Sequence, residues 1–506
     1  MNVFAIGIGG TGAKCVEALL HLHAAGLITD QAGKNVRLGT FLVEPDQQST
    51  LLARTEIAID RYSKLREQIG NATEGFAESE IDHYGTWSPL AGATPGISLD
   101  QVFSKPVLRN EAPGLAALFD CLYPPEEQKA ELDVGFRGRP PIGSAVMSRI
   151  SLAKAAESGS WKRLLGDIQT ASGSGVPPIV HLFGSVFGGT GASGVPTLGG
   201  MLKSWLQQQG LSKVRVHASL LLPYFDFDGQ GDQGTGVHAE ARNFQLNTDA
   251  ALQYLANNGR SCFDQVYLIG SDIKARYDFS IGGRSQDNDA HIIELLATLG
   301  VRHGCSTPAA KDYAYVLSRS KEGQISWADI PDNGVVGTGL ARAARFAVSW
   351  KRNYSLEVDA AQKTPVKTFA SGAPWIRNYF SMTEESTSRR EGRPSIRAQE
   401  QLAIKQAIDG YSATLLQWLR QFSSNTGPNF NQELFGEDQL MNDETYANQL
   451  SSVVRGSAKP TLADHADTVD RIKILMDELP QSEIRFRGVA GLTDSLWKLC
   501  IQSKNS

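Results

Sequence analysis

The chain has few cysteines, and they follow no metal-binding pattern. Its 506 residues include five cysteines, an odd number, with no CxxC pair among them. Widely spaced single thiols are typical of a reducing compartment, and they argue against a disulfide framework or a zinc site. We therefore expect a cytoplasmic protein whose thiols are reduced.

Long apolar runs and an excess of positive charge are also missing. No stretch approaches the roughly 20 apolar residues of a membrane-spanning helix. The N-terminal "MNVFAIGIGG" lacks the basic residues of a signal peptide and is expected to be a buried strand. The formal net charge of −5 gives no reason to expect nucleic acid or an anionic membrane as a partner. At 41% hydrophobic and 20% charged residues, the composition indicates an ordinary globular protein.

Short apolar runs alternate with helical patterns in the first half of the chain. Several runs are almost continuously apolar, as in strands that helices cover on both faces. Strands are expected at residues 2–8, 36–43, 178–185, 214–223 and 263–270. Strands that alternate with helices predict βαβ units, and therefore an α/β fold with a parallel sheet.

The pattern changes near residue 305. Residues 288–304, "NDAHIIELLATLGVRHG", are apolar on more than one face and predict a buried helix. Residues 381–397 are polar and charged and predict a loop. A long amphipathic helix should follow, because apolar residues repeat there at three and four: Ile404, Ile408, Tyr411, Leu415 and Leu419. We place one domain at 1–305 and a second at 306–506.

Two glycine-rich segments each lie between a predicted strand and a predicted helix. In "FAIGIGGTGAK", Gly7, Gly9 and Gly12 have the G-x-G-x-x-G spacing, which lets a phosphate approach the free N–H groups at a helix start. Alone this signal is weak, because a plain glycine turn has the same appearance. A Walker loop is excluded, since Lys14 comes one position too late and Cys15 is no magnesium ligand.

The second segment, residues 183–200, reads "FGSVFGGTGASGVPTLGG" and has seven glycines in eighteen positions. Successive glycine N–H groups form an anion-binding nest at the positive end of a helix dipole. The hydroxyls of Thr190 and Ser193 add donors. A dinucleotide fold needs one such loop for its pyrophosphate, so two loops in one sheet indicate a nucleotide whose phosphates are held from two sides.

These segments resemble those of the tubulin/FtsZ superfamily. "FGGTGASG" is similar to the family's GGGTGSG signature, with Phe187 at the position of the first glycine. "GIGGTGAKCVEALL" resembles its first phosphate loop, and "FLVEPDQQSTL" (41–51) resembles the stretch near the phosphates and Mg²⁺. "EARN" (240–243) and "VYLIGSD" (266–272) are similar to the segments that approach the ribose and the base. The resemblance covers roughly residues 1–305 and follows the family's order.

The resemblance implies a GTP- or GDP-binding domain that includes the central helix, and a second α+β domain with extra C-terminal helices. Glu44 and Asp46 would hold Mg²⁺ directly or through water, and Arg137 or Arg139 would approach the γ-phosphate. For Ser271, Asp272 and Asn288, a role as helix or turn caps remains open. The residues expected at the nucleotide are Gly9, Gly10, Thr11, Gly12, Glu44, Asp46, Arg139, Gly188, Gly189, Thr190, Gly191, Ala192, Ser193, Gly194, Glu240, Asn243, Ser271 and Asn288.

The resemblance also implies assembly, because the family hydrolyses GTP where the next head-to-tail subunit inserts an acidic loop. "ISWADI" is the stretch most like that loop, which makes Asp329 the candidate catalytic residue, with Asp312 and Asp332 as rivals. The leading interpretation is thus a filament-forming GTPase, whose C-terminal helices could bind a protein partner.

Two alternatives remain. One is a nucleotide-bound scaffold or switch that does not hydrolyse its ligand. The other is an NAD(P)-dependent oxidoreductase, suggested by the first glycine motif and Glu44. Against it, Glu44 lies 32 residues beyond Gly12, further than the ~20 residues expected of a ribose-binding acid.

Overall fold

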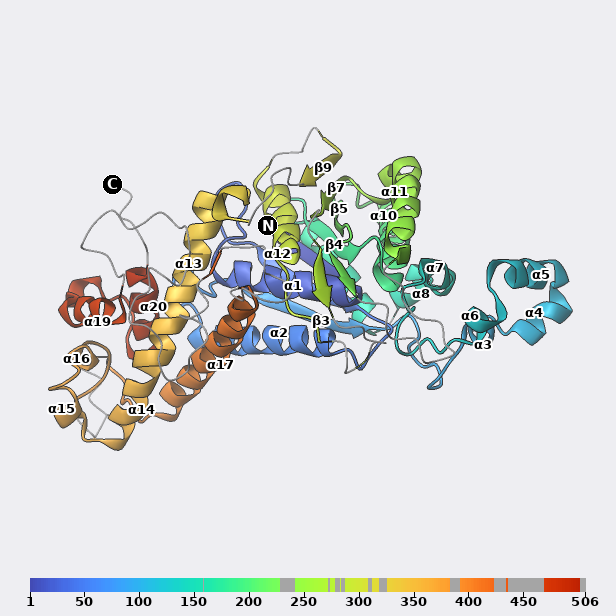
Figure 1. Cartoon of the computed structure of the whole chain (residues 1–506). Coiled ribbons are helices and arrows are strands. Elements are labelled where there is room, and N and C mark those ends of the chain that lie inside the picture. Colours follow the sequence, from blue (N-terminus) through green and yellow to red (C-terminus); the bar gives the residue numbers. More distant parts are fainter. Residues whose placement is uncertain are drawn as a thin grey trace. The chain divides into compact units, whose positions relative to one another are not determined.

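The chain divides into two compact units by its internal contacts. The computed structural model describes residues 1–157, 159–227, 242–271, 274–277, 283, 287–307, 312–317, 325–382, 392–422, 434–435 and 468–500 (Figure 1). The first unit comprises Met1–Leu19, Thr29–Ile57 and Ile81–Lys321, and the second comprises Leu20–Ile28, Ala58–Glu80 and Glu322–Ser506. The boundary expected near 305 falls inside helix α12 (Ile292–Ser306), which belongs whole to the first unit.

The first unit is built on a seven-stranded sheet whose neighbouring strands are all parallel. The strand order is β3-β2-β1-β4-β5-β7-β9. The bounds are β1 (Asn2–Ile8), β2 (Arg37–Val43), β3 (Ile81–Trp87), β4 (Ile179–Ser185), β5 (Arg215–Leu221), β7 (Gln265–Ile269) and β9 (Ala314–Leu317). The α/β class and the five strands expected from the sequence are confirmed. The sequence missed β3 and β9. Both are edge strands that are largely exposed or half-buried; β3 carries no apolar run, and the apolar run of β9 is only four residues long.

Helices cover both faces of this sheet. The long ones are α1 (Gly9–Ala24), α2 (Thr50–Ile69), α9 (Gly159–Ser172), α10 (Gly189–Gln208), α11 (Arg242–Cys262) and α12. Val180 and Leu182 of β4 join the hydrophobic cluster that includes side chains of α9 and α10. His181 points to the other face, where Ser219 Oγ lies 2.8 Å from its Nε2 and donates to the Ala297 carbonyl of α12 at 2.8 Å. Successive strand residues point to opposite faces, so α10 and α12 lie on opposite sides of the sheet.

Two additions to this framework were not expected from the sequence. One is the two-stranded parallel sheet of β6 (Phe225–Phe227) and β8 (Ala275–Tyr277). The other is a series of short helices between β3 and α9: α3 (Leu99–Val102), α4 (Lys105–Glu111), α5 (Pro113–Leu122), α6 (Pro125–Lys129), α7 (Pro140–Met147) and α8 (Leu152–Ala155).

The regular secondary-structure elements described in the second unit are helices. Its main helices are α13 (Asn333–Ser349), α14 (Ser355–Lys363), α15 (Val366–Phe369), α16 (Ile376–Tyr379), α17 (Gln399–Gln421), α19 (Val469–Glu478) and α20 (Gly488–Leu499). The long amphipathic helix is confirmed as α17, and all five of its predicted apolar positions are buried. The sheet expected in the second domain has no counterpart in the described part of this unit, because its apolar residues repeat at helical spacing.

None of the helices in the described ranges combines the length and the hydropathy needed to cross a membrane.

Two histidines are buried in the sheet of the first unit. His181 and His217 have no exposed surface. Burial lowers the pKa of His181 from 6.5 to about 3, and it lowers the pKa of His217 well below 6.5. Both rings are therefore neutral in the folded chain at pH 7.

These histidines predict a loss of stability in mild acid. Below about pH 6.5 the unfolded chain binds protons that the folded chain excludes, so the free energy of unfolding falls as the pH drops toward 3. His181 should contribute about 2 kcal/mol to the loss between pH 7 and pH 5, and His217 contributes in the same direction. Urea unfolding of His181→Asn at both pH values should show a pH difference about 2 kcal/mol smaller than that of the wild type. If the free energy of unfolding changes equally with pH in the two proteins, the lowered pKa of His181 is contradicted.

Candidate functional site

The two glycine-rich segments meet at the carboxyl edge of the sheet. α1 begins at Gly9 directly after β1, and α10 begins at Gly189 shortly after β4. β1 and β4 are neighbours, and from them the chain winds in opposite directions, to β2 on one side and to β5 on the other (Figure 1). In open α/β sheets, ligands bind in the crevice that forms at such a switch point.

The first turns of α1 and α10 lie in contact. A methyl group on Gly9 would lie 3.3 Å from Cβ of Thr190 and 3.4 Å from the backbone N of Gly191. The N-cap residue of α10 is Gly188, so no N-cap side chain takes up the first N–H groups of this helix. The partly exposed residues of the two turns are Gly10, Thr11, Gly188 and Thr190. Two positive helix ends therefore converge on one small surface, as an anion site requires.

Several glycines of the two segments are needed for packing alone. A methyl group on Gly12 would lie 2.6 Å from the Phe183 carbonyl oxygen, and one on Gly191 would lie 2.6 Å from the Ser185 carbonyl oxygen. Such distances to backbone atoms leave no room for a side chain. These glycines hold α1 and α10 against the ends of the strands whether or not a ligand binds.

Not every residue of the predicted second loop faces the crevice. Ser193 is buried, and its Oγ donates to the Gly189 carbonyl at 2.7 Å. Ala192 and Gly194 are also buried. The predicted hydroxyl donor at position 193 is thus committed to its own helix, whereas Thr190 remains partly exposed at the crevice.

Phe187, which stands where the resembled signature has a glycine, is part of an aromatic cluster. Its ring is buried, and its centroid lies 4.8 Å from that of Phe244, 5.3 Å from that of Phe225 and 6.0 Å from that of Tyr224. The side chain therefore packs into the unit, and it anchors the start of the loop.

A further loop, residues 135–139, lies against the start of α10. A methyl group on Gly189 would lie 3.0 Å from the Phe136 carbonyl oxygen and 3.1 Å from the Gly138 nitrogen. Asn247 of α11 joins the two loops, because its Nδ2 donates to the carbonyls of Phe187 at 2.9 Å and of Gly138 at 3.2 Å. No motif singled out Asn247, which becomes a candidate only through these long-range contacts.

The two arginines of this loop have protein partners. Arg137 Nε donates to the Glu131 carbonyl at 3.0 Å. Arg139 Nη1 lies 3.5 Å from Glu127 Oε1, a long distance for an ion pair, and its buried Nε has no hydrogen-bond partner among the described residues. Arg139 is therefore the less firmly held of the two.

Glu44 and Asp46 are buried in the loop after β2. Glu44 Oε1 accepts a hydrogen bond from the Asp46 N–H at 3.1 Å. Asp46 accepts from the N–H groups of Gln48 at 3.0 Å and of Gly283 at 2.6 Å. Burial raises the pKa of Glu44 to about 8, and the nearby Asp46 charge also raises it. At pH 7 Glu44 is mostly protonated, and the pair shapes its loop through backbone contacts.

Lys14 lies below the crevice in a buried ion pair. Its Nζ is 2.5 Å from Glu294 Oε1 and donates to the Asp289 carbonyl at 3.0 Å. Tyr224 donates to the same carboxylate oxygen at 2.5 Å. The first turn of α12 is thus fixed beneath α1, and Lys14 is neutralised there.

Arg54 of α2 holds the segment that precedes α12. Its Nε donates to Glu17 Oε2 at 2.9 Å, and its Nη1 donates to the Asn288 carbonyl at 3.2 Å. Arg54 thus contacts the backbone carbonyl of Asn288. The partly exposed side chain of Asn288 takes no part in this hydrogen bond.

The other predicted residues belong to other segments of the chain. Asn243 lies in the first turn of α11, and Ser271 follows β7. Glu240 and Asp272 lie outside the described residues. Asp329 belongs to the second unit, where its carboxylate accepts hydrogen bonds from the Ser326 N–H at 2.9 Å and the Ser326 hydroxyl at 3.1 Å. Among the described residues, no three histidine, cysteine, aspartate or glutamate side chains form a cluster that could hold a metal ion.

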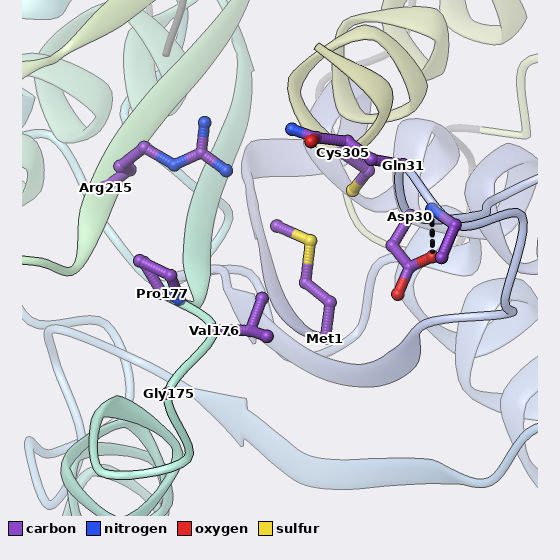
Figure 2. Close-up of a pocket in the computed structure, with 9 residues that line it drawn as sticks. Met1, Asp30, Gln31, Gly175, Val176, Pro177, Arg215 and Cys305 are labelled. Atoms are coloured by element: carbon purple, nitrogen blue, oxygen red, sulfur yellow. Dashed lines mark hydrogen bonds between the residues drawn. The ribbon is translucent and has the colours of Figure 1, made fainter. Parts of the chain in front are cut away.

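A cavity of about 440 Å³ lies at the opposite, amino edge of the sheet (Figure 2). It is lined by Met1, Asp30, Gln31, Ala32, Gly175, Val176, Pro177, Arg215 and Cys305. Arg215 Nη2 donates to the Gly304 carbonyl near the end of α12 at 3.3 Å. The C-terminal end of a helix carries a negative partial charge. This cavity is therefore a poorer place for phosphate than the crevice between the glycine loops.

No protein-family model matches the chain, and no curated protein matches its sequence.

The buried ion pair predicts a large effect of Lys14→Met. This change leaves the Glu294 carboxylate buried without its cation, so we expect the free energy of unfolding to fall by about 3–5 kcal/mol. Chemical denaturation of the purified protein measures it.

Lys64→Met provides the matched control. Lys64 pairs with Asp60 at 2.7 Å, but both side chains are more than half exposed, so its loss should cost about 1 kcal/mol or less. The double variant Lys14→Met/Glu294→Gln should recover part of the stability. Equal costs for Lys14→Met and Lys64→Met would show that the buried pair contributes no more than a surface pair.

Proposed function

We propose that the crevice at the β1/β4 switch point binds the phosphates of a nucleotide, with GTP or GDP as the ligand. The observation that carries the proposal is the contact between the first turns of α1 and α10, where Gly9 approaches Thr190 and Gly191. N–H groups at two helix starts would face the phosphates, and both dipoles favour negative charge.

Three side chains would complete the phosphate site. The hydroxyls of Thr11 and Thr190, both partly exposed, would donate to phosphate oxygens. Arg139 would exchange its 3.5 Å contact with Glu127 for a phosphate, since charge-assisted bonds from a guanidinium to phosphate are short and often bidentate. Asn247 would keep the Arg139 loop in place through its bond to Gly138.

A magnesium ion fits this site only in part. Mg²⁺ is usually held by one or two carboxylates together with phosphates and retained waters, and Glu44 and Asp46 supply two carboxylates. Both Asp46 oxygens accept backbone N–H groups, however, and Glu44 must lose its proton before it can bind a metal ion. Asp46 would therefore act through water, and the ion would reduce the repulsion between the phosphates.

The preference for guanine, the head-to-tail filament and hydrolysis at its junctions rest on the resemblance to the tubulin/FtsZ superfamily. In that reading Ser271 and Asn288 would approach the base, and Asp329 of a neighbouring subunit would activate water.

One observation favours a second candidate, a nucleotide-bound scaffold or switch without turnover. The Asp329 carboxylate already accepts two hydrogen bonds from Ser326, the residue that caps the short helix to which Asp329 belongs. A protein partner would then read the nucleotide state.

Thr190→Asp tests nucleotide binding. The side chain at 190 is partly exposed, so the variant should fold, and a carboxylate at this point would repel phosphate. We expect the Kd for a fluorescent GTP analogue to rise at least tenfold, measured by fluorescence titration with Mg²⁺.

Thr197→Asp is the control, because it places the same carboxylate on α10 but about 10 Å further along the helix. It should bind the analogue as the wild type does. Equal affinity of Thr190→Asp and the wild type would contradict the proposed site. Displacement of the analogue by NADH and not by GTP would favour the oxidoreductase instead.

Phosphate release from GTP over a series of protein concentrations separates the two candidates. Release that begins above a threshold concentration would support a site completed between subunits. Binding without release at any concentration would support the scaffold.

A further inference from the structure

Helix α5 carries apolar side chains on both of its faces. The inward face packs through Ala116 and Phe119, which are buried. The outward face carries Leu115, Leu118 and Leu122, which are 58%, 52% and 58% exposed. We call these three residues the leucine face. The largest contiguous apolar patch on a protein surface often marks an interaction site.

The leucine face is almost free of charge. Asp120 is the one charged residue of α5, and side chains of α4 and α6 contact its carboxylate. Gln128 Nε2 donates to Asp120 at 3.0 Å, Lys105 forms an ion pair with it, and Arg109 lies 3.4 Å away. The other exposed residues of α5 are uncharged: Pro113, Gly114, Leu115, Ala117, Leu118, Cys121 and Leu122.

The spacing of the leucine face points to a helix as its partner. Leu115, Leu118 and Leu122 follow one another at three and four residues, the spacing of a coiled-coil seam. A helix with the same spacing would cover them. A second copy of this chain supplies such a helix, its own α5, and no other protein is then required.

We propose that two copies of this chain form a two-fold symmetric dimer in which α5 packs antiparallel against α5 of the second copy. Leu118 would lie at the two-fold axis, and Leu115 would face Leu122 of the second copy. At a two-fold axis a residue meets its own copy, so a charged residue there would face a like charge. An uncharged strip avoids this repulsion. This contact uses one surface twice, and it therefore differs from the head-to-tail contact discussed above and requires no nucleotide.

The required area shows how far the contact must extend. A stable dimer buries about 800 Å² on each copy, which is more than three half-exposed leucines provide. The interface must therefore take in the outer surface of α4 as well, where Val107 is 51% exposed. The rim there carries both signs of charge, from Arg109 and Glu111, so opposite charges can meet across the axis.

The chain contains its own reporter for this contact. Cys121 is exposed next to the leucine face, and the other four cysteines are buried. Cys121 lies three residues from Leu118, or about 4.5 Å along the helix. A short bismaleimide should therefore link the two Cys121 thiols of a dimer, and sedimentation of the full chain in EDTA without nucleotide should show twice the monomer mass.

Substitutions locate the interface. Leu118→Asp would place two carboxylates at the axis, so the dimer Kd should rise at least tenfold and the cross-link should disappear. Leu246→Asp, at a leucine of α11 that is 67% exposed, should leave both unchanged. Cys121→Ser should lose the cross-link and keep the dimer.

A wild type that remains monomeric and uncross-linked at 100 µM would overturn the proposal, as would a Leu118→Asp variant as dimeric as the wild type. Binding of a monomeric wild type to lipid vesicles would overturn it in favour of a membrane.

Discussion

The close approach of two helix starts to two strand ends is the constraint on which the candidate site depends. Gly12 and Gly191 leave no space for a Cβ against the carbonyl oxygens of Phe183 and Ser185. Because both helices are pressed onto neighbouring strands, their first turns also meet each other at Gly9 and Thr190. The same packing that closes the interior of the first unit thus brings two helix starts to one surface, and the positive end of a helix dipole favours an anion.

Much of the positive charge of this surface comes from the backbone, since the buried cations beneath it are paired. A lysine in the second turn of α1 would add to the positive end of its dipole. Lys14 is instead paired with Glu294, and Arg54 with Glu17. These buried pairs hold α1, α2 and the start of α12 together, and they remove free positive charge from beneath the crevice. A chain with a net charge of −5 can therefore still present a local anion site.

The sequence predicts the elements whose residues follow a regular local pattern, and it misses the features that depend on contacts between residues far apart in the chain. The strands β1, β2, β4, β5 and β7 are apolar runs because helices cover them, whereas the edge strand β3 lacks such a run and that of β9 has only four residues. Both glycine loops could be located from their spacing. The bond from Asn247 to Gly138 joins residues 109 positions apart, and no local pattern marks it. From the sequence, Phe187 is only a departure from a glycine, because the aromatic residues that pack around it come from two other segments of the chain.

Glycine spacing alone cannot separate packing from ligand binding, but the contacts of each glycine can. Gly12 and Gly191 are explained by the backbone atoms they touch. Gly188 is different, because its φ of −84° suits any residue, and a methyl group there would meet one side-chain atom, Ser185 Oγ, at 3.0 Å. The backbone conformation does not require glycine at this partly exposed position, and the one close contact is a side-chain hydroxyl and not a backbone atom. A group that must approach the N–H groups of α10 closely supplies the missing reason, and a phosphate is such a group.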